Sequence, residues 1–252
     1  MAHHSVTPEE LVLAVKDPIA RLGGGYMVSG QAKTKSKELG TGGWGLYMIG
    51  RGGPLGDVDP AVVTAAMHFF PYERVATNWT RARAVVTPQE GAAVWAGVCH
   101  EWASVHLADA KGLDRLAELL PKVIAAADAS GRTLFAGWAA MPLPEDPAGR
   151  VAQLCHVLRE FRGASHGMAC AVNGLTPRQA VLTGGGSGNA DFFGWPEPNP
   201  DVTELAPRKA DAEALTDRLV TPAWTSLDAD EQAEVATLLS DASEAAFVSM
   251  SR

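Results

Sequence analysis

Apolar side chains recur every three to four residues over most of the chain, which is the spacing of amphipathic helices. Thr7-Pro8-Glu9-Glu10 and Thr87-Pro88-Gln89-Glu90 each combine an N-cap hydroxyl, a proline at the first helical position and a glutamate that completes a capping box. No stretch shows the alternation and β-branched enrichment typical of strands. We therefore expect an all-α fold with a multi-helix, bundle-like body. The pattern predicts helices at about 8–21, 60–69, 88–108, 111–129, 147–172, 209–221 and 228–247.

Two glycine-rich segments interrupt this pattern. Residues 40–56 contain eight glycines, and residues 183–207 are rich in glycine, proline and asparagine. The second segment also carries Phe192, Phe193 and Trp195. Because a simple linker rarely contains three aromatic side chains, we expect a loop that packs on the body or covers a site. The expected division is a helical ligand-binding or catalytic body at 1–180, followed by a part at 181–252 made of this loop and the C-terminal helices.

Composition and charge narrow the class of protein. Hydrophobic residues make up 46% and charged residues 20% of the 252 residues, which is typical of a folded globular protein. The net charge of −8 argues against a general nucleic-acid or anionic-membrane surface, although it leaves room for a local basic patch. No apolar run reaches the roughly 20 residues of a membrane helix, and the N-terminus shows no secretory signal. With three scattered cysteines that fit reduced thiols, these features predict a cytoplasmic protein with no membrane partner.

The common motifs for phosphate and metal binding are missing from the sequence. The glycine clusters match neither GxxxxGK[ST] nor a GxGxxG between a strand and a helix. His100 and His106 are six residues apart and lie on different sides of a helix, while His156 and Glu160 supply only two ligands. The sequence therefore predicts no nucleotide loop and no metal site.

One face of the helix predicted at 88–108 carries Trp95, Cys99, Trp102 and His106. Two interpretations remain open. The stripe is either a core face that ends in a satisfied histidine, or the aromatic wall of a ligand pocket in which His106 makes the polar contact.

The helix predicted at 147–172 carries the strongest candidate site, because Cys155, Arg159, Arg162 and His166 share one of its faces. Arginine can hold a carboxylate or enolate in bidentate fashion, and histidine exchanges a proton near neutral pH. The alternative is that the two arginines pair with surface acids while His166 packs inside.

Three segments resemble a known family: LREFRGASHGMACAVNGL at 158–175, GRGGPLGDVDPAVVTAAMHFF at 50–70 and EALTDRLVTPAWTSLDADE at 213–231. The chain is similar to a largely uncharacterised actinobacterial family with a helical N-terminal domain and a winged-helix, MarR-like C-terminal part. Members usually have a second histidine where this chain has Phe161, so two-histidine chemistry lacks its partner here. The residues that match the family motifs are Gly50, Arg51, Pro54, Leu55 and Gly56 in one segment, and Arg159, Arg162, Gly163 and His166 in the other.

The chain departs from this family between about 183 and 208. A recognition helix with its two-stranded wing needs on the order of 40–50 residues. The segment contains no basic amphipathic helix, and Arg208 and Lys209 are its only cations. The resemblance then implies a degenerate winged-helix remnant whose helices serve packing or a homodimer. We accordingly expect no nucleic-acid partner.

The leading hypothesis is a small-molecule-binding protein, specifically a cofactor-independent enzyme of actinobacterial specialised metabolism that uses acid/base and electrostatic catalysis in an enclosed helical pocket. His166 is the expected acid/base group, and Arg159 and Arg162 are the expected anchors for an anionic substrate. The expected substrate-binding residues are Arg51, Trp95, Trp102, His106, Phe192, Phe193 and Trp195. Two alternatives stay open: a MarR-like ligand-sensing transcriptional regulator, and a haem protein with His166 or His106 as axial ligand. No cofactor is predicted, with haem the one left open.

Overall fold

The computed structural model describes residues 7–251, so part of the N-terminus considered for a secretory signal lies outside the described residues. Over that range the regular elements are α-helices and short 3₁₀-helices, with no strand, which confirms the all-α prediction. The elements are α1 (Pro8–Leu22), η1 (Gly25–Val28), α2 (Gly30–Glu38), α3 (Gly45–Gly52), η2 (Gly53–Leu55), α4 (Pro60–Met67), α5 (Tyr72–Arg83), α6 (Pro88–His106), α7 (Leu113–Ala126), α8 (Thr133–Ala139), α9 (Pro147–Val172), α10 (Pro177–Phe193), η3 (Thr203–Leu205), α11 (Ala206–Trp224) and α12 (Ala229–Met250).

The helix-start signals work as the sequence predicts. Thr87 accepts a hydrogen bond from the backbone N–H of Glu90 (3.2 Å), and the Glu90 carboxylate accepts one from the backbone N–H of Thr87 (2.9 Å). Thr7 closes the same capping box at the start of α1. These reciprocal bonds satisfy backbone donors that a helix start otherwise leaves free, and so they define where α1 and α6 begin.

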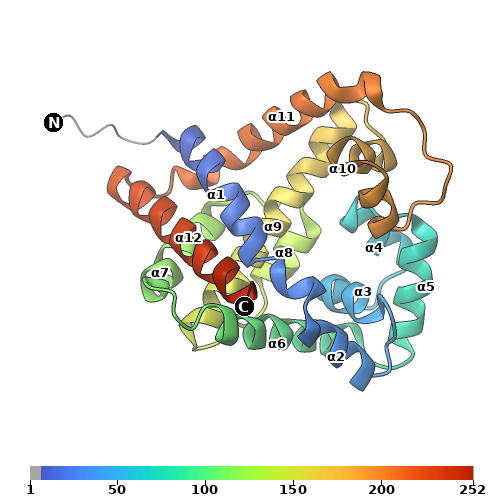
Figure 1. Cartoon of the computed structure of the whole chain (residues 1–252), viewed down its shortest axis with the longest axis horizontal. Helices are drawn as coiled ribbons and strands as arrows, with labels where there is room; N and C mark the ends of the chain where they lie inside the picture. The colour runs from blue at the N-terminus through green and yellow to red at the C-terminus, as the bar shows by residue number, and fades with distance from the viewer. Residues whose placement is uncertain (1–6, 252) are drawn as a thin grey trace.

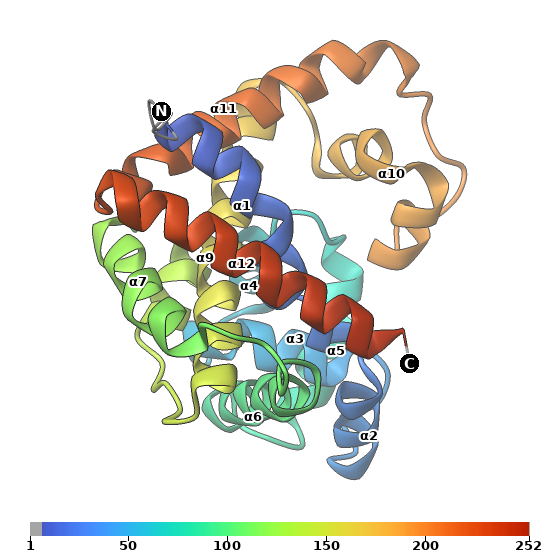
Figure 2. The same cartoon turned by 60° about the vertical axis from the view of Figure 1, so that its left-hand side comes forward.

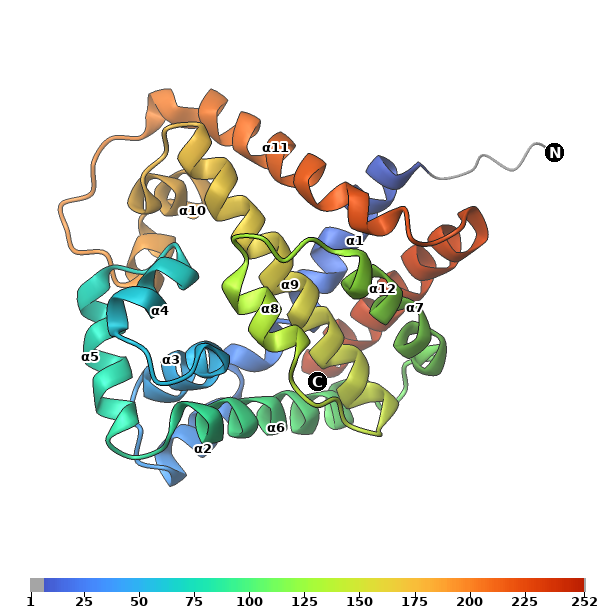
Figure 3. The same cartoon turned by 180° about the vertical axis from the view of Figure 1, so that it is seen from behind.

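Helix α9 runs through the middle of the molecule, with α6 on one side and α11 on the other (Figures 1 and 3). Sixteen of its residues are buried, including the polar side chains of Gln153, His156 and Glu160. Helices α2 to α5 lie at the end of the molecule opposite α7 and α12 (Figure 1). Helix α9 therefore lies between the helices at the two ends of the molecule and packs within the core.

The C-terminal helices pack against the helical body. Helix α12 crosses the outer side of α1 (Figure 2), and Trp224, Val235 and Leu239 belong to the same core cluster as Leu11. The division at residue 180 stays a prediction about domains; the main apolar cluster includes residues of both α1 and α12, whereas the buried residues of α10 belong to two smaller clusters.

Both glycine-rich segments contain helix. All eight residues of α3 are buried, and a Cβ on Gly50 would lie 2.6 Å from the Cβ of Trp95, so glycine here permits close packing of α3 on α6. In the second segment the loop prediction is wrong for 183–193, which belongs to α10. Only Gly185 and Gly186 leave the helical conformation, with φ of 66° at Gly186. Glycines that allow close packing cannot be told by pattern from glycines that end a helix.

The end of α10 is attached to the body by aromatic contacts. Phe193 lies against Phe70 with ring centroids 4.7 Å apart, and Phe192 lies against Trp44 at 5.0 Å. The indole N–H of Trp195 donates to a backbone oxygen in the turn between α4 and α5 (3.0 Å). These contacts place the three aromatic residues of the segment over the start of α3 and the turn between α4 and α5.

Candidate ligand pocket and nucleic-acid interface

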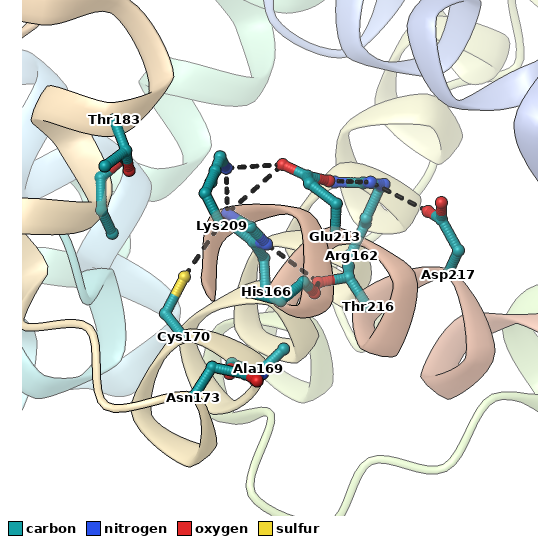
Figure 4. Close-up of polar contacts among 12 residues, drawn as sticks. Arg162, His166, Ala169, Cys170, Asn173, Thr183, Lys209, Glu213, Thr216 and Asp217 are labelled. Atoms are coloured by element: carbon teal, nitrogen blue, oxygen red, sulfur yellow. Dashed lines mark hydrogen bonds and ion pairs between the residues drawn. The ribbon is translucent and has the colours of Figure 1, made fainter. Parts of the chain in front are cut away.

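The arginine and histidine stripe of α9 faces α11 along part of its length (Figure 4). One guanidinium nitrogen of Arg162, Nη2, donates to Glu213 Oε2 (2.9 Å) and to Asp217 Oδ1 (3.0 Å). Lys16 of α1 reaches the same aspartate, Asp217, at 3.3 Å. Arg162 is therefore held by the acids of α11.

Both ring nitrogens of His166 are engaged by α11. Thr216 donates its hydroxyl proton to the backbone oxygen of Ala212 (2.7 Å), so it accepts at Oγ1 from His166 Nδ1 (2.8 Å). The other ring nitrogen, Nε2, then accepts from the ammonium of Lys209 (3.0 Å). This pattern requires a neutral imidazole protonated at Nδ1. Burial, followed by the positive charge of Lys209, lowers the pKa of His166 to about 4.

The network around His166 joins two helices and leaves little room for proton exchange with a substrate. Burial raises the pKa of Glu213, but hydrogen bonds from Lys209 and Arg162 outweigh burial and hold it at about 2. Arg159 lies apart from this network, with Nη1 3.5 Å from Glu160 Oε1. The catalytic roles of Arg159, Arg162 and His166 therefore stay predictions.

Arg51 forms a buried bidentate ion pair. Its Nε and Nη2 donate to the two carboxylate oxygens of Glu160 at 2.7 and 2.8 Å, and its Nη1 donates to the hydroxyl of Tyr47 at 3.2 Å. Burial raises the pKa of Glu160, but the charge and hydrogen bonds of Arg51 outweigh burial and hold it at about 2. Burial lowers the pKa of the adjacent His156 to about 4. The guanidinium of Arg51 thus interacts with protein groups that lie inside the core.

The aromatic side chains of α6 lie in two different surroundings. Trp102 is buried, its ring lies 5.1 Å from that of His106, and His106 Nδ1 is 3.0 Å from the hydroxyl of Ser249 on α12. Trp95 is nearer the N-terminus of α6, is also buried in the core cluster, and borders a pocket. Trp102 thus belongs to the core, whereas a ligand-binding role for Trp95 stays a prediction.

That pocket has a volume of about 450 Å³. It brings together two of the predicted binding residues, Trp95 and Phe192, although they are far apart in the sequence. Sequence reasoning missed the remaining wall, because it did not predict α2 and α3. The missed lining residues with the largest side chains are Met27, Lys33, Leu46, Trp44 and Tyr47.

A basic surface adjoins the pocket. Apart from Arg51, which is buried and paired with Glu160, residues 30–85 carry six Lys and Arg against four Asp and Glu, a local net charge of +2 in a chain of net charge −8. Helix α2 supplies Lys33, Lys35 and Lys37. Arg81 of α5 is exposed and donates to two backbone oxygens of the loop that follows α2, at 3.1 and 2.9 Å. The local charge of this segment is opposite in sign to the charge of the whole chain, so the whole-chain value conceals it.

Helices α4 and α5 form a close pair beside this basic surface. They are joined by the four residues 68–71, within the length typical of a helix-turn-helix turn. On α5 the buried face consists of Val75, Trp79 and Ala82. Its other face presents polar side chains to solvent, among them Thr77 and Thr80.

Comparison with known proteins identifies the family. The model of a helix-turn-helix family matches residues 14–203, which is most of the chain. The chain belongs to this helix-turn-helix family. No curated protein and no solved structure gives a significant match.

Membership of the helix-turn-helix family changes one expectation from the sequence. The prediction of no nucleic-acid partner is wrong, because the family match points to nucleic-acid binding. It rested on the acidic charge of the whole chain and on a missing recognition helix near residue 190. The relation to a helical family is confirmed, whereas the MarR-like winged helix, its degenerate form and the homodimer stay predictions.

Residues 7–251 form neither a metal centre nor a membrane-spanning helix. No group of three or more His, Cys, Asp or Glu side chains is arranged to hold a metal ion there. Within the same range, no helix combines the length and apolarity needed to cross a membrane.

Proposed function

We propose that this protein is a DNA-binding transcriptional regulator, the alternative class raised by its sequence. The observation that carries the proposal is the helix-turn-helix family match over residues 14–203. Such a role places the protein where the DNA is, in agreement with the expected cytoplasmic location. The enzyme hypothesis gains no support from the comparisons, and it is not part of this proposal.

The DNA-contacting surface in this proposal consists of α2 and α5. Affinity for DNA comes largely from cations that neutralise phosphates, and the local charge of residues 30–85 is positive. Lys35 forms only an exposed i,i+3 pair with Glu38, and Lys37 is exposed. Since exposed ion pairs of this kind are weak, both ammonium groups are available to phosphate oxygens.

Helix α5 is the proposed reading helix. In a helix-turn-helix motif the second helix enters the major groove, and α5 is the second helix of the α4–α5 pair. Thr77 and Thr80 on its exposed face are able to donate to or accept from base edges. The arrangement predicts that α2 positions the backbone while α5 contacts bases.

The proposal is tested by fluorescence anisotropy with a labelled duplex from upstream of the protein's own gene. We expect affinity to fall linearly in a plot of log K against log salt between about 50 and about 200 mM. An unrelated duplex of the same length serves as the specificity control. If the protein binds neither duplex at the lowest salt, the proposal of DNA binding is refuted.

A matched pair of double variants tests the location of the surface. Lys35→Gln with Lys37→Gln should reduce the magnitude of the salt slope by about two, roughly one for each phosphate contact. Lys111→Gln with Lys122→Gln makes the same change of charge near and within α7 and should leave the slope unchanged. Equal effects of the two double variants would refute the α2 surface.

A further inference from the structure

The pocket beside α2 has the size and lining of a small-molecule site. Its volume of about 450 Å³ lies within the range of about 300–1,000 Å³ that is common for ligand pockets. Four aromatic side chains line it: Trp44 directly before α3, Tyr47 from α3, Trp95 from α6 and Phe192 from α10. The helix-turn-helix family match says nothing about this pocket.

The aromatic rings are arranged around the pocket at close spacing. Ring centroids are 4.9 Å apart for Trp44 and Tyr47, 5.0 Å for Trp44 and Phe192, and 5.7 Å for Tyr47 and Trp95. All three pairs are edge-to-face, so rings of different orientation border one space. Such walls favour a flat aromatic molecule, which can meet both ring faces and ring edges.

The charge of the lining selects the ligand further. Lys33 is the one charged residue among the described residues that line the pocket, and no carboxylate lines it. No carboxylate of the lining therefore competes with an anionic ligand for the ammonium of Lys33.

We propose that this pocket binds a flat aromatic ligand that carries one anionic group. The aromatic part occupies the space between Trp44, Trp95 and Phe192, and the anionic group is attracted by the ammonium of Lys33. Neutral aromatic molecules bind the same space more weakly, because they make no use of Lys33.

Phe192 closes the pocket from the side of α10. The second part of α10 begins after the break at Gly185 and Gly186, and Phe193 anchors it on Phe70. Phe192 itself is 40% exposed, so it lies between the pocket and solvent. Its removal should open the pocket without creating a hole in the core.

The test uses two probes with the same ring skeleton. Anilinonaphthalene sulfonate carries an anionic group, and N-phenylnaphthylamine lacks it. Each is titrated into the full chain and followed by probe fluorescence, with stoichiometry from calorimetry and no DNA present. We expect one site per chain and tighter binding of the sulfonate. More than one equivalent site, or equal affinity for both probes, would overturn the proposal.

Three variants locate the site. Lys33→Gln should weaken the sulfonate probe about fivefold, the upper range for a partly exposed ion pair, and leave the neutral probe unchanged. Phe192→Ala should weaken both probes about fivefold through the lost ring contact. Lys111→Gln, the matched control outside the pocket, should affect neither probe. Thermal unfolding of each variant checks that the fold is intact.

The results separate this proposal from the proposed DNA function. Sulfonate binding that is the same in Lys33→Gln, Phe192→Ala and the original chain would overturn the pocket assignment. Because no DNA is used, such a result would leave the DNA-binding proposal untouched.

Discussion

The buried pair of Arg51 and Glu160 should be among the most sensitive points of the fold. Glu160 is 2% exposed and accepts two short hydrogen bonds from Arg51, which is itself 8% exposed. Glu160→Gln keeps the shape of the side chain but leaves the guanidinium charge buried without its counter-charge. Removal of one partner from such a pair typically costs about 3–5 kcal/mol.

The pKa of Glu160 gives a second route to the same magnitude. The folded-state pKa is about 2 against an ordinary value of 4.5, and this difference corresponds to about 3 kcal/mol. Because the folded pKa is depressed, this stability is present above about pH 4.5 and is lost as pH falls towards about 2. The depressed pKa and the general cost of breaking a buried pair describe the same interaction, and both indicate a loss of about 3 kcal/mol or more, a large part of a typical total of about 5–15 kcal/mol.

Urea unfolding followed by far-ultraviolet circular dichroism measures the loss. With a slope of about 3 kcal/mol per molar, Glu160→Gln should lower the midpoint by about 1 M or more. The control replaces both partners, Arg51→Met with Glu160→Met. Since the pair with two apolar side chains leaves no unpaired charge, we expect most of the stability to return. A loss below about 1 kcal/mol in Glu160→Gln would refute the buried-charge reasoning.

Three further predictions concern other parts of the molecule. The ring protons of His166 should titrate near pH 4 in NMR spectra, because burial and the neighbouring lysine favour the neutral ring. A midpoint near 6.5 would contradict the hydrogen bonding of His166 described above. Cys99 and Cys155 should not react with Ellman's reagent in the folded protein, because burial raises the pKa of both thiols; fast reaction without denaturant would show that they are accessible. Phe193→Ala should lower the unfolding free energy by about 2 kcal/mol, since Phe193 is only partly buried against Phe70, and should speed hydrogen exchange in residues 187–195 more than in α6. Equal exchange in both segments would show that α10 is not anchored by this ring.

Helices with strong end signals and one apolar face were predictable. The prediction for α9 agrees with the structure at both ends, because Asp146-Pro147 caps its start and Gly174 follows its end. Helix α3 was missed because it is buried on all sides and so has no polar face to produce a period. Helix α2 was missed for the opposite reason, since only Ala32 and Ser36 of its nine residues are buried.

The candidate site shows which information a single sequence lacks. The spacing of Arg162 and His166 correctly puts both on one face of α9, but it cannot say that this face meets the acids of α11 some 50 residues later. The pocket wall could not be predicted for the same reason, since its residues come from segments that are far apart in the sequence. Trp95 and Phe192 were noticed as aromatic, whereas Lys33 becomes significant only when α2 is placed beside them.

Both proposed sites use lysines of α2, and this leads to one joint prediction. Lys33 lines the pocket, while Lys35 and Lys37 of the same short helix belong to the proposed DNA surface. An anion bound beside Lys33 repels the DNA phosphates at this surface, and salt partly screens this repulsion. We therefore expect a two- to fivefold loss of DNA affinity, which corresponds to about 0.4–1 kcal/mol. The measurement repeats the anisotropy titration with saturating anilinonaphthalene sulfonate. N-phenylnaphthylamine, which adds no charge, should have a smaller effect at saturation. Equal effects of the two probes would mean that the pocket acts on DNA binding through shape rather than charge, and no effect of either would show that the pocket and the DNA surface are independent.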